Sequence, residues 1–334
     1  MKRTTRREQR TLIIMTALLA AAVLASLLAG RYPIPLSALA GRLFLGAFPN
    51  PQMEAVFFTV RLPRVVMAVL VGAALAASGA GFQGIFQNPL ASPDLLGASS
   101  GAAAGAALAI LLRLPAFLIT VFAFAMSLLT IALVMFIGGK VKQKSLFVLV
   151  LTGLMLSSLH NAAVSLMKLL ADTHNTLPEI VYWLMGSLAK VRQADIKFVV
   201  IPMIAGFAPL LIFRWKINLL TLGDDEAQSM GVDVKKMRAL VIVSSTLITA
   251  SAVSVSGIIG WAGLVVPHIS RKFSGSDYRY LMPVSMLFGA LFLLLVDNIS
   301  RNLLSAEIPL GILTAAAGVP FFLWLITRKE RQSF

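Results

Sequence analysis

Cysteine is absent from this 334-residue sequence, and charged residues make up only 13% of it. The lack of cysteine excludes a disulfide framework and any metal site that uses thiolate ligands. The three histidines, His160, His174 and His268, lack the paired spacing that is typical of metal sites. A phosphate-binding P-loop is also missing, which excludes ATP hydrolysis on this chain by that route.

Hydrophobic residues are what the sequence has in excess. They form 58% of the chain, and the mean hydropathy is +0.87, whereas soluble domains contain about 45–50% apolar residues. A soluble protein could not hide this much apolar surface, but a bilayer solvates it. Hydrophobic runs extend from residue 12 to residue 326 with no polar stretch long enough for a soluble domain. We therefore predict an all-α integral membrane protein with a single transmembrane domain over residues 1–334.

Helical spans can be located because about 20 apolar residues are needed to cross the hydrocarbon core. The first apolar run is longer than the ~7–15 residues of a signal-peptide core, which predicts a retained first span. The eighth run is too short to cross alone, so it borrows flanking residues or enters the membrane only in part. The candidate spans are residues 12–29, 65–82, 95–112, 117–137, 146–169, 198–213, 239–256, 257–266, 281–296 and 308–326.

The distribution of cations tests this series of spans. The net charge of +15 lies in short basic clusters between apolar runs, which is typical of loops at an anionic membrane surface rather than of a nucleic-acid site. Both termini are basic, so both are predicted to be cytoplasmic, and the number of spans must then be even. Including the short eighth segment gives ten. The basic clusters that fall inside are residues 1–10, 140–144, 214–238, 271–279 and 328–331.

Charged side chains are rare inside these spans. Asp297 and Glu307 lie at span ends, and no carboxylate lies in the middle of one. His160 and Asn161 form the one deep polar pair, which is either a hydrogen-bonded packing contact or a relay for protons or a ligand. An ion-coupled secondary transporter is the main alternative to an ATP-driven one, but it would lack an obvious ion carrier.

Small residues recur at intervals of four in the third candidate span, at Gly97, Gly101 and Gly105. This spacing lets helices approach closely. It predicts tight packing in the bundle and is also compatible with small residues lining a channel.

The loop of residues 217–238 contains an acidic run between two glycines. Gly223 precedes the acidic residues 224–226, and acids at a helix N-terminus complement the helix dipole. Gly231 ends that helix, and a second begins after it. The pattern predicts two short helices at the cytoplasmic face, which are either an interfacial connector or a docking element for a cytoplasmic partner.

Arg61, Arg64 and Arg301 fall on the outer side, against the prevailing charge bias. They either reach toward lipid headgroups or form ion pairs with an acidic soluble partner. Ser187 in the outer Gly186–Ser187 pair is a weak hint of an intramembrane hydrolase, but no histidine can be placed beside it.

Short motifs carry a family resemblance over nearly the whole chain, from the second span to the C-terminus. Together, in this order, they resemble the FecCD-type permeases, the membrane subunits of ABC importers that include the cobalamin permease BtuC and the ferric-siderophore and haem permeases. The motifs are RLPR (61–64), NPLASPDLLG (88–97), GAAAGA (101–106), YWLMGSL (182–188), LTLGDDEAQSMGV (220–232), GLVVPHISR (263–271), DYRYLMP (277–283), EIPLGI (307–312) and GVPFFLWL (318–325).

The resemblance implies a BtuC-like, type II importer fold of about ten transmembrane helices in the cytoplasmic (inner) membrane. A second permease, either another copy or a paralogue, would complete the translocation pathway. Two cytoplasmic ABC ATPase subunits would bind ATP and Mg, so no cofactor is expected on this chain. An extracytoplasmic binding protein would deliver the cargo. Membrane lipid is the other expected partner, and nucleic acid is not one.

Three groups of residues receive roles from the resemblance or from their position. Residues matching the ATPase-coupling segment are Gly223, Asp224, Asp225, Glu226, Ala227 and Gly231; those matching the docking site for the binding protein are Arg61, Arg64 and Arg301; and those assigned to the pathway from position alone are Gln83, Asn88 and Ser99. A ferric siderophore is the cargo that the resemblance favours, while haem, cobalamin and oxyanions remain open.

Overall fold

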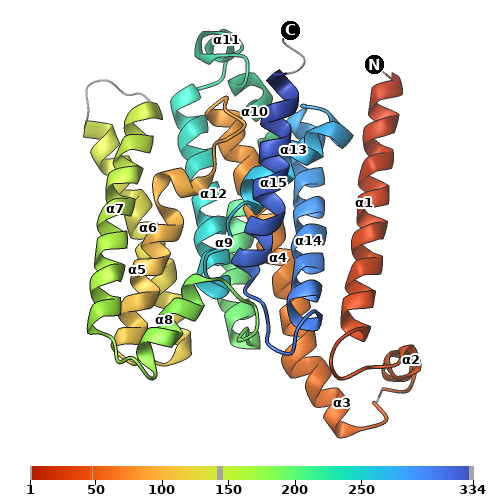
Figure 1. Cartoon of the computed structure of the whole chain (residues 1–334). Coiled ribbons are helices and arrows are strands. Elements are labelled where there is room, and N and C mark those ends of the chain that lie inside the picture. Colours follow the sequence, from red (N-terminus) through yellow and green to blue (C-terminus); the bar gives the residue numbers. More distant parts are fainter. Residues whose placement is uncertain (1, 47, 141–145, 331–334) are drawn as a thin grey trace.

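A computed structural model describes residues 2–46, 48–140 and 146–330, and these residues form helices and connecting loops without a β-strand (Figure 1). Lys142, Lys144 and Arg331 of the predicted basic clusters lie outside the described residues. The elements are α1 (Lys2–Leu28), α2 (Leu36–Leu45), α3 (Pro51–Ala55), π-helical η1 (Val56–Arg61), α4 (Leu62–Ile85), 3₁₀-helical η2 (Pro93–Leu96), α5 (Ala98–Leu111), α6 (Ala116–Lys140), α7 (Leu146–Leu170), α8 (Thr176–Leu184), α9 (Gln193–Ile212), α10 (Arg214–Leu220), α11 (Asp224–Ser229), α12 (Val234–Ser256), α13 (Ala262–Ser274), α14 (Tyr278–Asn302) and α15 (Leu310–Glu330).

Each predicted span overlaps a helix of the structure. Among the described residues, seven helices are long and apolar enough to cross a membrane, and α5 and the first part of α15 are shorter apolar helices. The two termini lie at the same end of the bundle (Figure 1), here named the N/C end. That arrangement requires an even number of crossings, as the cation clusters predicted.

The short eighth span, residues 257–266, is helical only in its second half and borrows the residues that follow it, which agrees with one of its two predicted forms. Residues 257–261 have no helical structure, and the helix α13 begins only at Ala262 and continues to Ser274. The irregular backbone is tolerated because it is packed within the protein: each of residues 257–261 is buried or half-buried. The eighth segment is therefore an irregular stretch followed by a helix that continues beyond residue 266.

The second span is longer than predicted. Elements α3, η1 and α4 form one helical run from Pro51 to Ile85, 35 residues in length. At 1.5 Å per residue this run measures about 52 Å, whereas the hydrocarbon core is about 30 Å thick. Its first turns and α2 project beyond the other helices at the end opposite the termini (Figure 1). This end is named the opposite end below.

Small residues set the spacing of the helices. A Cβ atom on Gly72 of α4 would lie 2.3 Å from the carbonyl oxygen of Gly289 in α14, so these helices touch through their backbones. A Cβ on Gly105 of α5 would lie 2.3 Å from the carbonyl of Phe122 in α6. The packing role predicted for the glycines of the third span is therefore confirmed.

Helix α4 forms the centre of the bundle, and α1 and α7 form its periphery. The most apolar 18-residue window is 83% buried in the run that contains α4, but only 17% buried in α1 and in α7. A membrane helix with this much exposed surface must be covered by lipid or by another protein chain.

Candidate functional site

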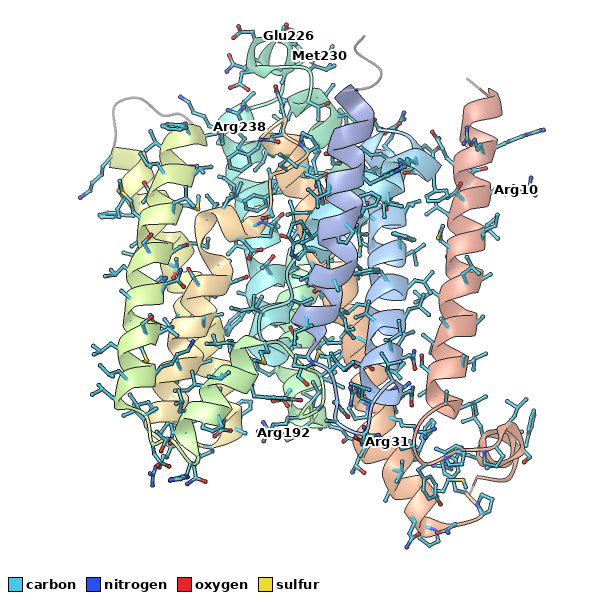
Figure 2. The ribbon with its side chains drawn as sticks, viewed as in Figure 1. Arg10, Arg31, Arg192, Glu226, Met230 and Arg238 are labelled. Carbon is cyan, nitrogen blue, oxygen red and sulfur yellow. The ribbon has the colours of Figure 1, made fainter. Side chains whose placement is uncertain are left out.

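The acidic loop forms a small helix that projects from the N/C end (Figure 1). Helix α11 begins at Asp224 and ends at Ser229, as the glycines on either side predicted. The side chains of Glu226 and Met230 lie at this outermost tip (Figure 2), where Met230 is 58% exposed. Ala227 alone is buried, and it fixes the helix to the bundle. Of the predicted coupling residues, Asp225, Glu226 and Gly231 are therefore exposed, and Gly223 and Asp224 are partly exposed.

Two glycines allow the chain to enter and leave α11. Gly223 has φ +132° and Gly231 has φ +79°, conformations that side chains with a Cβ rarely adopt. Asp224 is the one acid of the turn with an internal ion pair, with Arg238 of α12 at 2.5 Å. Asp225 and Glu226 are exposed.

The predicted pair of short helices needs one correction. The helix that begins at Val234 is not short, because it continues to Ser256 as the span α12. The second short helix lies before α11 instead, as α10. The boundary between α9 and α10 falls at Phe213, where the predicted span 198–213 also ends, but the helix of residues 214–220 was not predicted.

Helix α10 connects α11 to the centre of the bundle. The side chain of Asn218 donates to Asp277 at 2.8 Å and accepts from the amide of Tyr278 at 2.8 Å, both at the start of α14. The side-chain amide of Gln87, which follows α4, donates to the carbonyl of Leu220 at 2.9 Å. A displacement of α11 would therefore reach α4 and α14 through hydrogen bonds. None of these contacts was predicted from the sequence.

At the opposite end the structure brings Arg61, Arg64 and Arg301 together, and all three are buried. The Arg64 Nε atom lies 2.9 Å from Oδ1 of Asp297, and its Nη1 atom lies 2.9 Å from Oε1 of Glu307. Arg64 is therefore engaged by two carboxylates of its own chain. Sequence analysis located both acids at span ends but did not pair them with this arginine.

The other two arginines bind the end of α1. Arg61 Nη1 donates to the carbonyls of Leu27 and Leu28 at 2.8 Å each, and Arg301 donates to the carbonyl of Ser26 at 2.8 Å. The last carbonyls of a helix lack partners within the helix and carry partial negative charge. Arg61 and Arg301 thus cap the C-terminus of α1, an internal contact that neither sequence interpretation included.

A cavity of about 250 Å³ opens beside the cluster, and Arg31, Arg61, Arg64, Arg301 and Glu307 contribute to its wall. Arg31 is exposed and lies at this end of the molecule (Figure 2). The Nη2 atom of Arg64 and the Oε2 atom of Glu307 are buried without a hydrogen-bond partner. The arginines therefore face a hollow rather than an open surface.

The three residues assigned to the pathway are not brought together. Gln83 is buried and donates to the carbonyl of Leu264 at 3.3 Å, while Arg271 donates to its oxygen. Asn88 is exposed and accepts from the amide of Leu90 at 2.9 Å. Ser99 is half-buried, and its hydroxyl donates to Asp94. They lie in three different environments.

A polar stripe on α7 was only partly recognised from the sequence. Ser158, Asn161 and Ser165 are exposed, and intervals of three and four residues place them on one face of the helix. His160 points inward instead: it is buried, and its Nδ1 atom lies 3.3 Å from the hydroxyl of Ser100. The deep His–Asn pair is therefore divided between the packed interior and an outward-facing stripe within a membrane span.

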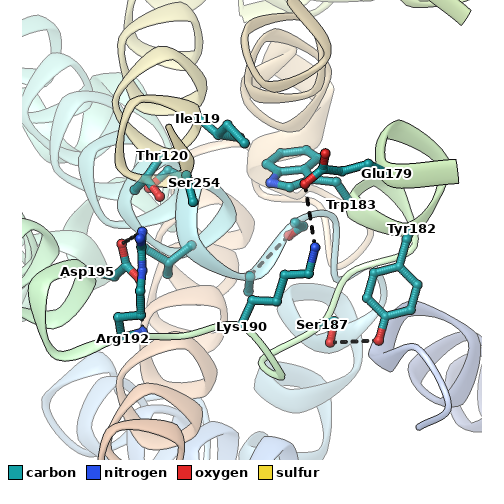
Figure 3. A pocket seen from close by; sticks show the side chains of 14 residues that line it. Ile119, Thr120, Glu179, Tyr182, Trp183, Ser187, Lys190, Arg192, Asp195 and Ser254 are labelled. Carbon is teal, nitrogen blue, oxygen red and sulfur yellow. Dashed lines mark hydrogen bonds and ion pairs between the residues drawn. The ribbon is translucent and has the colours of Figure 1, made fainter. Parts of the chain in front are cut away.

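Ser187 lies in a second cavity, of about 130 Å³, among α6, α8, α9 and α12 (Figure 3). Its hydroxyl lies 3.4 Å from that of Tyr182 and accepts from the amide of Ala189 at 3.1 Å. No histidine is among the residues that line the cavity. The described residues therefore place no histidine beside Ser187 as a general base. They also contain no group of three histidine, aspartate or glutamate side chains able to hold a metal ion.

The profile of the FecCD transport family matches residues 18–328. The molybdate import permease MolB of Haemophilus influenzae is 41% identical over 95% of each chain. A probable iron chelatin transport permease of Helicobacter pylori is 41% identical over 84% of each chain. A solved inward-facing ABC transporter assigned to the metal-chelate type has a TM-score of 0.87 and 40% identity, with 96% of this chain and 99% of that chain covered.

Proposed function

This chain belongs to the FecCD transport family and is a non-catalytic permease subunit of an ABC transporter, and we propose that it passes an iron chelate through the cytoplasmic membrane. The observation that carries the transport function is the projecting helix α11, with its exposed acids and exposed Met230, because it supports coupling to separate ATPase subunits. It gives separate ATPase subunits a surface to bind at the end where both termini lie.

We propose that the N/C end is cytoplasmic. The basic N-terminal segment and the basic residues of the 214–238 region lie at this end, which agrees with the preference of cations for the cytoplasmic side. Two ATPase subunits would each engage one α11. When the two ATPase subunits close around ATP, they would displace α11. The hydrogen bonds that join α10 to the start of α14 and to the end of α4 would carry that displacement into the bundle.

The pathway is proposed to run along α7, at the contact with a second permease. The exposed amide of Asn161 would be costly against lipid, whereas the hydroxyls of Ser158 and Ser165 donate to carbonyls of their own helix at 3.0 and 2.9 Å. All three side chains suit a water-lined passage. Hydroxyl and amide groups without fixed charge offer weak contacts, which let a bulky solute pass without being trapped. Alternating access would then follow from two arrangements of the same pair of permeases.

We also propose that the opposite end receives an extracytoplasmic binding protein. The exposed Arg31 and the arginine-lined cavity give that end an excess of positive charge. An acidic surface on the binding protein would complement it and guide the encounter.

An iron chelate is the first candidate cargo because related permeases are named for iron chelates and for the metal-chelate type. Molybdate is the second, because the relative named for it matches 95% of both chains. The α7 stripe of Ser158, Asn161 and Ser165 carries no fixed charge. This favours the larger, charge-shielded chelate, since a small dianion would be expected to need cationic donors along its way.

The test is uptake by proteoliposomes that contain the permease, its ATPase subunits and its binding protein. ATP-dependent uptake of a radiolabelled ferric chelate supports the first candidate, and ATP-dependent uptake of molybdate alone supports the second. Uptake that needs no ATP but stops when the proton gradient is collapsed would overturn both in favour of an ion-coupled transporter.

A further inference from the structure

Arg64 is held by two carboxylates that differ in exposure. The side chain of Asp297 is 0% exposed and accepts from Arg64 Nε at 2.9 and 3.1 Å. The side chain of Glu307 is 26% exposed and accepts from Nη1 at 2.9 Å. Asp297 is fixed within α14, whereas solvent reaches Glu307. The two bonds to Arg64 are therefore unequal in how easily they can be replaced.

Glu307 can leave Arg64 without disturbing the backbone. It lies between the end of α14 and the start of α15. Its neighbour Ile308 is bound to Ser300 in both directions, through an amide donor at 3.2 Å and a carbonyl acceptor at 2.6 Å. The loop is thus anchored on one side of Glu307, while the glutamate side chain retains its own rotatable bonds. Exchange requires only a change of rotamer.

The cavity beside the pair has the charge and the free atoms to accept another carboxylate. Four arginines line it against the single acid Glu307. Arg64 Nη2 is buried and unpartnered and Arg64 as a whole is 5% exposed. An unsatisfied buried donor is unfavourable, so a carboxylate that reached Nη1 and Nη2 together would make a bidentate contact that Glu307 does not make.

We propose that Glu307 is an exchangeable counter-ion for Arg64. In the free permease it neutralises the arginine. When the extracytoplasmic binding protein docks, an acidic side chain of that protein enters the cavity, takes the place of Glu307 on Arg64 and releases Glu307 to solvent. This inference rests on the proposed function, because it names the contact by which the binding protein would be recognised.

Exchange of one carboxylate for another keeps the number of ion pairs constant. The affinity of the binding protein then changes little with salt concentration, and Glu307 competes with the binding protein's carboxylate for Arg64. The substitution Glu307→Gln preserves size and removes the competing charge. It should tighten binding by about fivefold, the scale of a partly exposed ion pair, and make binding more sensitive to salt because docking now forms an ion pair that was absent before.

The experiment measures the affinity of the purified binding protein for the permease–ATPase complex in nanodiscs at low and at high salt. The variants are Glu307→Gln, Arg64→Gln and, as matched control, Glu179→Gln. Glu179 also lies at the opposite end, where it pairs with the exposed Lys190 at 3.5 Å, and its substitution should leave affinity unchanged. Assembly of the complex reports whether each variant folds.

The outcomes separate the inference from the function on which it rests. Tighter, more salt-sensitive binding by Glu307→Gln with weaker binding by Arg64→Gln supports exchange. If Arg64→Gln weakens binding but Glu307→Gln does not tighten it, the cavity is a docking site and exchange is overturned. If neither substitution changes affinity, the binding protein docks elsewhere. If the wild-type complex captures no binding protein, the proposed importer function fails at this step.

Discussion

The acidic turn of α11 and the arginine cluster at the opposite end are both short charged motifs, but the chain treats them in opposite ways. Asp225 and Glu226 are exposed, and only Asp224 of that turn has an internal ion pair. Arg64 is buried and is bound by two carboxylates of its own chain. The first motif is left available for a partner, whereas the second already holds the bundle together.

This contrast separates two reasons for which a membrane protein carries charge. Charges at the tip of a projecting helix contribute little to the stability of the chain that bears them. A buried ionic cluster is different, because removing one member leaves its partner charged and desolvated. Substitution of the exposed acids of α11 should therefore impair assembly with a partner, whereas loss of the fully buried Asp297 should impair folding.

The largest effect is expected for Asp297→Asn. Arg64 and Arg301 would lose the fully buried carboxylate that lies 2.9 and 3.9 Å from them. Loss of one partner from a buried pair costs about 3–5 kcal/mol, so the free energy of unfolding should fall by that order. Thermal unfolding of the purified permease in detergent measures the change.

A double substitution checks the interpretation of that result. Replacing Arg64 by Met together with Asp297 by Leu removes both charges and should recover part of the lost stability, since well-packed apolar groups can replace a buried pair. An unaltered melting temperature in Asp297→Asn alone would mean that the cluster does not stabilise the bundle.

The next effect concerns the exposed end. Reversing the charge of Asp225 and Glu226 to Lys should weaken binding of the ATPase subunits by about tenfold or more, because like charges would then face each other or a favourable pair would be lost. Stability should change by no more than about 0.5 kcal/mol, as for other surface substitutions. Co-purification of ATPase subunits and thermal unfolding give the two values. Asp172→Lys, a charge reversal of one residue at the opposite end, should retain the ATPase; equal losses in both variants would contradict the docking role of α11.

Sequence reasoning located the spans and α11 because those features are local. Hydrophobic runs identify membrane helices, and Gly223 and Gly231 bracket the acidic turn in the sequence itself. The partners of Arg64 could not be found in that way, since Asp297 and Glu307 lie more than two hundred residues away. Periodicity did not predict residues 257–261 either, because an irregular segment inside a bundle has no repeating pattern of apolar residues.

A moderate effect is expected where the exposed end meets the core. Asn218→Ala removes the bonds to Asp277 and to the amide of Tyr278 and should lower stability by about 1 kcal/mol. If α10 transmits the motion of α11, the variant should also hydrolyse more ATP for each molecule of cargo transported. Asn175→Ala, which breaks a comparable contact to Asp172 at the opposite end, should leave that ratio unchanged. If Asn218→Ala hydrolyses the wild-type amount of ATP for each molecule of cargo transported, Asn218 has a purely structural role.

The smallest effect is a pH dependence at this same junction. Burial raises the pKa of Asp277, but hydrogen bonds from Arg279 and Asn218 outweigh it, and the net pKa is lowered. A carboxyl group with a lowered pKa stabilises the fold above its ordinary value of about 3.9 and loses that contribution as the pH falls through the folded value. Asp277→Asn retains a helix-capping side chain but removes the charge and the second carboxylate oxygen, which accepts from Arg279 at 2.9 Å. The difference in melting temperature between wild type and variant should therefore be largest near neutral pH and shrink below about pH 4. A difference that stays constant from neutral to acidic pH would mean that the Asp277 charge contributes nothing, and that hydrogen-bond geometry alone joins α10 to α14.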